Sequence, residues 1–212
     1  MSSLTAANAA ATTDRNGNSR VIHPAWARAM HWANAVAIIV MMMSGWQIYN
    51  ASPLFNFTFP AAITLGGWLG GGIMWHLAAM WLLVVNGLFY LTLGLATGRF
   101  RRKLTPISAS GVIDDSRAAL TGKLSHDDIS NYNNVQKLLY IGIMVVGVVI
   151  VLSGLAIWKP VQFQYLTALF GGYDIARYVH FFMMAAIVAF LVVHVALSLL
   201  VPKSLRAMII GK

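Results

Sequence analysis

Four long apolar stretches, nearly free of charged residues, constrain the fold of this 212-residue chain more than any other feature. They run over residues 26–47, 68–97, 138–158 and 178–201. About 20 consecutive apolar residues cross a bilayer as an α-helix, and backbone polar groups inside hydrocarbon must be satisfied within helices or closed barrels. Because the stretches are continuously apolar rather than alternating, they predict an all-α, integral membrane four-helix bundle.

Composition narrows the chemistry that such a bundle can carry. Hydrophobic residues make up 58% of the chain and charged residues 10%, which is far from the balance of a soluble protein. The sequence contains no cysteine, and this excludes thiolate-bound iron–sulfur clusters, covalently attached c-type haem and disulfides. A redox cofactor would therefore have to be held by histidine or methionine.

The charges predict how the chain is organised around the membrane. Lys and Arg gather before the first stretch, between the second and third, and after the fourth, whereas residues 48–67 contain none. By the positive-inside rule both termini are cytoplasmic. We expect a disordered cytoplasmic tail at 1–25, a transmembrane domain at 26–202 with a cytoplasmic loop at 98–137, and a cytoplasmic tail at 203–212. The net charge of +9 then reflects topology and contact with anionic membrane lipid, and nucleic acid is not an expected partner.

Four histidines lie within the apolar stretches, where an imidazole is costly and is normally retained for a function. They are His31, His76, His180 and His194. If the helices alternate in direction, His76 and His180 lie near the outer surface, and His31 and His194 lie toward the cytoplasm. The 14 residues from His180 to His194 span roughly 21 Å of helix and return to within about 40° of the same face. The sequence therefore predicts two b haems, each bound by two histidines.

A single histidine in a membrane helix is more often a hydrogen-bond partner between helices or part of a proton pathway. Four histidines at two matched depths favour haem ligation instead. We expect His23 and His126, which lie outside the apolar stretches, to be solvated and to play no part in the haem sites. Iron with two axial imidazoles has no open position, so such a haem passes electrons and does not activate oxygen.

Two arginines are candidates for binding the haem propionates. Arg28 and Arg177 each precede one of the histidines by three residues, about one helical turn toward the water. An anchoring role at the cytoplasmic surface is an equally good explanation for Arg28, and an ion pair with Asp174 is an alternative for Arg177.

A quinone pocket is expected near the cytoplasmic boundary, with Trp32, Lys137 and Tyr140 as its candidate residues. Glycines in the second and third stretches make room either for flat macrocycles or for close helix packing, and the sequence does not choose between these. They are Gly87, Gly94, Gly142, Gly147 and Gly154. No internal repeat is evident.

Five short motifs resemble those of the bacterial di-haem cytochrome b family. They are RAMHW at residues 28–32, SGWQIYNA at 44–51, WH at 75–76, YNNVQKL at 132–138 and ARYVH at 176–180. The family includes cytochrome b561 and the membrane subunits of nickel–iron hydrogenases, formate dehydrogenases and thiosulfate reductases, and the resemblance covers residues 22–211. It implies haem b on the four histidines, a quinone site near the cytoplasmic haem, and location in a bacterial inner membrane. The short chain and the motif at 44–51 are most similar to members paired with a periplasmic molybdopterin oxidoreductase.

These observations lead to one main hypothesis and two alternatives. The main hypothesis is electron transfer between the quinone pool and a periplasmic redox partner, with no catalytic residue in this chain itself. One alternative is a self-sufficient membrane oxidoreductase, such as a superoxide oxidase or a ferric reductase, which would need a cationic funnel at the outer haem. The other is a haem-free transporter, which would need intramembrane acidic residues or broken helices. The sequence leaves the partner, the direction of electron flow and the oligomeric state open.

Overall fold

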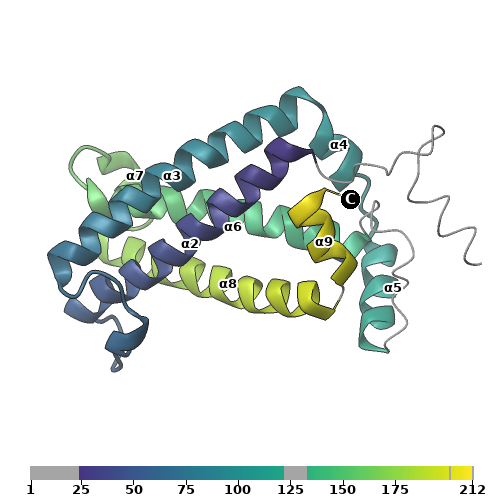
Figure 1. The fold of residues 1–212 in the computed structure, drawn as a ribbon. Helices are drawn as coiled ribbons and strands as arrows, with labels where there is room; N and C mark the ends of the chain where they lie inside the picture. The colour runs from purple at the N-terminus through teal and green to yellow at the C-terminus, as the bar shows by residue number, and fades with distance from the viewer. Residues whose placement is uncertain (1–23, 122–132, 201, 212) are drawn as a thin grey trace, which may run out of the picture. The chain divides into compact units, whose positions relative to one another are not determined.

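The computed structural model describes residues 24–121, 133–200 and 202–211, and all regular secondary structure in these ranges is helical (Figure 1). Four helices are long and apolar enough to cross a membrane: α2 (Ala25–Ala51), α3 (Leu69–Ala96), α6 (Asn134–Trp158) and α8 (Tyr173–Leu200). The shorter helices are η1 (Ala61–Ile63), α4 (Arg99–Leu104), α5 (Ala109–Leu120), α7 (Gln164–Leu169) and α9 (Pro202–Ile210). The predicted all-α membrane class with four spans is confirmed. The expectations for the N-terminal tail, His23 and His126 concern residues outside the described ranges.

Three of the four long helices extend beyond the apolar stretches that predicted them, whereas α3 ends within one residue of its stretch on both sides. Helix α2 continues to Ala51, α8 starts at Tyr173, and α6 starts at Asn134, inside the segment expected to be a loop. Hydropathy detects only the part of a helix that lies in hydrocarbon, whereas the helix itself continues into the polar interface. For the same reason the segment expected to be a C-terminal tail contains the short helix α9, which is not apolar enough to cross a bilayer.

The chain packs as two compact units, which we name after one residue in each. The His76 unit consists of Ala29–Leu93 and Gly147–Ala186. Of the described residues, the Lys137 unit contains 24–28, 94–121, 133–146, 187–200 and 202–211. Each unit is described separately below.

In the His76 unit, α2 and α3 are joined by polar contacts at two levels. The Asn86 side-chain amide on α3 donates to the Met30 carbonyl and to the Asn34 side-chain oxygen on α2, at 2.7 Å each. At the other level, the Ser44 hydroxyl on α2 lies 3.1 Å from the His76 ring on α3. Because water is absent from hydrocarbon, these polar groups must find partners within the protein, and in doing so they fix the register of the two helices.

The segment that joins α2 to α3 folds back onto the end of α2. Asn50 forms two hydrogen bonds of 2.8 Å with the backbone N–H and C=O of Phe59. The Leu65 N–H donates to the Met43 carbonyl at 3.0 Å. Gly66 has φ +114°, and a Cβ there would lie 2.3 Å from the backbone nitrogen of Gly72, so the turn into α3 requires glycine.

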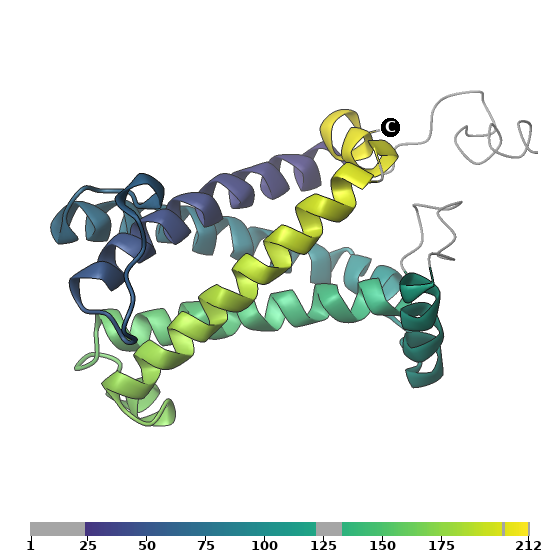
Figure 2. The same cartoon turned by 90° about the horizontal axis from the view of Figure 1, so that it is seen from below.

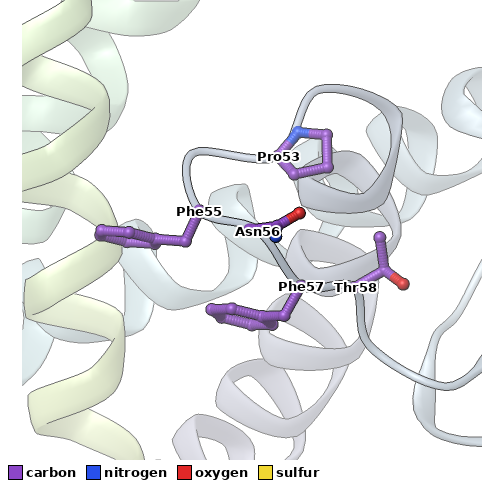
Figure 3. Close-up of a pocket in the computed structure, with 5 residues that line it drawn as sticks. All are labelled: Pro53, Phe55, Asn56, Phe57 and Thr58. Carbon is purple, nitrogen blue, oxygen red and sulfur yellow. The ribbon is translucent and has the colours of Figure 1, made fainter.

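Aromatic rings cover this end of the unit. Figure 3 shows the Phe55 and Phe57 rings on one side of the segment, directed toward α8, where they line a shallow pocket with Pro53, Asn56 and Thr58. The Phe55 ring lies 5.2 Å from the Phe181 ring of α8 between centroids. These contacts hold the α2–α3 connection against the first turns of α8.

The connection from α6 to α8 is shorter and contains α7 (Figure 2). The Thr167 hydroxyl of α7 donates to the Ala156 carbonyl near the end of α6 at 3.2 Å. Gly171 and Gly172, with φ of +86° and +104°, then turn the chain into α8. The connection is therefore held to α6 by a hydrogen bond and turned into α8 by two glycines.

In the Lys137 unit, the start of α6 is held by a capping box. The Gln136 N–H donates to the Asn133 side-chain oxygen at 2.7 Å, and the Asn133 N–H donates to the Gln136 side-chain oxygen at 3.1 Å. The Asp115 carboxylate of α5 accepts a hydrogen bond from the Asn134 N–H at 2.7 Å. The Lys137 ammonium donates to the Pro106 carbonyl at 3.0 Å, so α6 is tied to the segments that precede it.

Replacing Asn86 by leucine should destabilise the protein in detergent. The substitution removes both hydrogen bonds to α2, and interhelical hydrogen bonds in membranes contribute about 0.6 kcal/mol on average and up to about 1.7. We expect a lower midpoint of thermal unfolding in detergent than for Thr92→Leu, an equally apolar replacement at an exposed position of the same helix. Equal midpoints for the two variants would show that the Asn86 contacts do not hold α2 to α3.

Candidate functional site

The structure brings His76 of α3 and His180 of α8 together within the His76 unit. Their ring centroids are 6.2 Å apart, with the ring planes inclined at 64°. The sequence predicted this pairing from the depth of each histidine in the membrane, and the structure places the two side chains next to each other. The segments that carry them are separated by a hundred residues of sequence, so only the fold creates this proximity.

Each of these imidazoles is held through its Nδ1 atom. His76 Nδ1 lies 3.1 Å from the Met41 carbonyl oxygen, and His180 Nδ1 lies 3.1 Å from the Ile150 carbonyl oxygen. A carbonyl oxygen only accepts hydrogen bonds, so both Nδ1 atoms must carry the proton. Neutral imidazole has one proton, and Nε2 of both rings is therefore left as an electron-pair donor for a metal.

A glycine lies against each of the two rings. A Cβ added to Gly45 would come within 3.3 Å of His76 Cε1, and one added to Gly154 would come within 3.2 Å of His180 Cε1. Any larger residue would push on the ring. Gly154 was among the glycines noted in the sequence, and its function in the structure is close packing against an imidazole.

The spacing of the rings fits two axial ligands of one iron atom. A metal bound to an imidazole nitrogen lies about 2.0–2.1 Å from it, so two imidazoles on opposite sides of one ion place their ring centres about 6 Å apart. A porphyrin supplies four nitrogens in its plane and leaves iron in need of two further donors. His76 and His180 meet this requirement: they supply two donors, both Nε2 atoms are free of a proton, and the ring centroids have the separation expected for ligands of one iron atom.

His31 and His194 lie in different compact units, so their predicted pairing stays a prediction. His31 of α2 belongs to the His76 unit, and its ring packs edge-on against Trp32 with centroids 5.2 Å apart. His194 of α8 belongs to the Lys137 unit, and its ring stacks on Phe190 at 5.6 Å.

The arginines and the quinone candidates have the following positions. The Arg177 guanidinium donates to the Ser52 carbonyl at 2.5 Å and to the Ser52 hydroxyl at 3.1 Å, so it satisfies a carbonyl at the end of α2. Arg28 lies in the first turns of α2. Trp32 belongs to the His76 unit, whereas Lys137 and Tyr140 belong to the Lys137 unit. The propionate and quinone roles of these residues stay predictions.

Three residues around the histidine pair were given no role in the site by the sequence: Ser44 and Gly45 were noted only as the start of the motif at 44–51, and Ser153 was not noted. Ser44 and Ser153 each lie 3.1 Å from the Nδ1 atom of one of the paired histidines, and Gly45 follows Ser44 directly. The available signal was the Ser-Gly dipeptide, which occurs inside two of the apolar stretches. It is too short to stand out where small residues commonly serve helix packing.

An all-α membrane fold that faces two neutral imidazoles toward each other has the features of a b-type cytochrome. The profile of the prokaryotic cytochrome b561 family matches residues 22–211, and the chain belongs to this family. Membership implies haem b as the cofactor. Among its relatives is YedZ1 of Azospira oryzae, a candidate protein-methionine-sulfoxide reductase subunit. The two sequences are 54% identical over 190 residues, which cover 90% of this chain and 96% of the relative.

Replacing Gly154 by alanine should weaken haem binding. The new Cβ would lie 3.2 Å from His180 Cε1 and force the ring to shift by a few tenths of an ångström. Alanine favours the helix by up to about 1 kcal/mol over glycine, so loss of α6 would not explain a defect. Because disturbing the partners of a ligand typically costs 10–100-fold in metal affinity, we expect at least about tenfold weaker retention of haem, measured from the absorbance of haem per chain.

The matched control is Gly142→Ala, at an exposed position of the same helix where a Cβ meets nothing within 4 Å. This variant should keep its haem. Equal haem content in both alanine variants would mean that Gly154 does not position the ligand.

Proposed function

We propose that this chain carries electrons through the membrane on two b haems, between the quinone pool and a periplasmic oxidoreductase. The observation that carries the proposal is the His76–His180 pair, whose ring centres are 6.2 Å apart and whose Nδ1 atoms are both bonded to helix carbonyls. When bound there, haem b supplies an iron centre that takes up and releases one electron at a time. His76 and His180 would hold the iron of that haem through their Nε2 atoms.

A second haem on His31 and His194 completes the proposal. Helix α8 continues without interruption from Tyr173 to Leu200, so His180 and His194 stand roughly 21 Å apart along one helix. That separation suits two cofactors at different depths. Arg28 and Arg177, each one turn from a ligand, are the proposed contacts for propionates, although the Ser52 contact of Arg177 would then have to be shared.

The proposed orientation places both termini in the cytoplasm of a bacterial inner membrane, with His76 and His180 toward the periplasm. The distribution of Lys and Arg supports this orientation, because residues 48–67 contain neither. Trp32, Lys137 and Tyr140 are then proposed to line the site where quinone is oxidised or reduced. Quinone exchanges two electrons and two protons, so carriers that pass single electrons must act twice per molecule.

For the partner we propose a molybdopterin oxidoreductase that reduces methionine sulfoxide in periplasmic proteins. The support is the name of the 54%-identical relative, whose alignment covers 96% of its length. The electron and proton stoichiometry of the two reactions agrees. Quinol releases two electrons and two protons, and reduction of a sulfoxide to a thioether and water consumes the same number of each. A self-sufficient superoxide oxidase or ferric reductase is less well supported, because Arg177, on which a cationic funnel would depend, is engaged with Ser52.

Single histidine replacements should each remove one haem. We expect purified protein to hold two haems per chain, and His76→Ala and His180→Ala to remove the same haem because each removes one ligand of one pair. His31→Ala and His194→Ala should remove the other haem, and His126→Ala is the control that should remove neither. The measurements are haem per chain and the reduced-minus-oxidised spectrum. Wild-type protein without a b-type absorbance would refute the proposal.

Electron entry can be tested with a soluble quinol analogue. Added to purified protein under nitrogen, the analogue should reduce the haem within seconds, and substitution of Lys137 by alanine should slow this reaction by about tenfold without changing haem content. Superoxide and a ferric chelate are the comparison reagents. Rapid haem reduction by superoxide, or rapid haem oxidation by the ferric chelate, in the absence of any partner protein would favour the self-sufficient enzyme instead.

A further inference from the structure

The surroundings of His76 and His180 are built twice, by two different helix pairs. In the first pair, Ser44 and Gly45 of α2 contact His76 of α3. In the second pair, Ser153 and Gly154 of α6 contact His180 of α8. We call each set of serine, glycine and histidine a half-site.

The two half-sites agree in register as well as in residue type. In both, the histidine Nδ1 bonds to the carbonyl three residues before the serine, which is Met41 in one and Ile150 in the other, at 3.1 Å each. The serine–histidine distance is also 3.1 Å in both. Two helix pairs with different connections have thus arrived at one arrangement, which indicates that the arrangement itself matters.

The hydroxyl protons of the two serines have other partners. Ser44 Oγ lies 2.6 Å from the Val40 carbonyl, and Ser153 Oγ lies 3.1 Å from the Ile150 carbonyl. Because carbonyls only accept, each serine donates to its own helix, and its oxygen is left to accept from the histidine Nδ1–H. A hydroxyl that already donates is polarised and is a stronger acceptor.

Burial sets these serines apart. In the ranges that the structure describes, Ser44 and Ser153 are the two polar side chains in the buried class, each with 0% of its surface exposed. A buried hydroxyl is costly unless it is bonded, and alanine would serve helix packing as well. Their retention at the two equivalent positions therefore calls for a function in the site.

We infer that Ser44 and Ser153 are matched positioning residues that tune the two axial ligands of a haem, a role that rests on the function proposed above. By accepting from Nδ1–H, each serine shares the imidazole proton with the helix carbonyl and keeps Nε2 free for iron. It also raises the basicity of the ring, which strengthens electron donation and favours the ferric state. The pair thereby holds the haem at a lower reduction potential than the carbonyls alone would.

The test is a redox titration of the purified haem protein with Ser44→Ala, Ser153→Ala and the double variant. Each single replacement should raise the midpoint potential of one haem, and the double variant should raise it further by about the sum. The low-spin ferric signal in electron paramagnetic resonance should change for that haem alone. Ser116→Ala is the matched control, because the Ser116 hydroxyl also bonds to a carbonyl of its own helix, at 2.7 Å, but lies on α5.

A second pair of variants separates the hydroxyl from the volume of the side chain. Ser153→Thr and Ser153→Val have nearly the same shape, and only threonine keeps an oxygen. We expect threonine to keep the potential near that of the wild type and valine to raise it, or to lose haem at least tenfold more readily.

Two results would overturn the inference. One is full haem content with an unchanged potential in both alanine variants. The other is an equal loss of haem in the threonine and valine variants, which would show that volume rather than the hydroxyl matters. Failure of the proposed function itself has a different signature, because the unsubstituted protein would then show no b-type absorbance to titrate.

Discussion

The absence of water in the bilayer is the constraint on which the rest of this structure depends. A polar group within the spans is costly unless it finds a partner in the protein. The result is visible where helices meet, since Asn86 bonds to α2 and the His76 and His180 rings bond to carbonyls of neighbouring helices. The contacts that satisfy these groups also fix helix register, so the placement of the site and the stability of the fold have the same origin.

The helical framework follows from the sequence because hydropathy acts over some 20 residues at a time. The four spans were predicted in type and order, and some of their ends were missed by several residues where the helices leave hydrocarbon, as at Ala51 and Tyr173. The ends are set by local bonds, such as the reciprocal contacts of Asn133 and Gln136, which hydropathy does not register.

Part of the site was also accessible from sequence. Histidine is rare enough in a membrane span for its depth to be informative, and the His76–His180 pair was predicted on that basis. Its supporting residues were not, since a serine or a glycine in such a helix has many ordinary uses. What distinguishes Ser44 and Ser153 is a distance of 3.1 Å to an imidazole on another helix, and that distance exists only after folding.

Two half-sites on separate helix pairs also have a consequence for biogenesis. The first is complete once α3 has been made, but the second needs Ser153, Gly154 and His180, which are synthesised much later. In the function proposed above, neither half-site could bind iron from both sides by itself. Incorporation of a haem between them would therefore wait until α8 has been synthesised and inserted, and until then the Met41 carbonyl and the Ser44 hydroxyl keep the His76 proton on Nδ1.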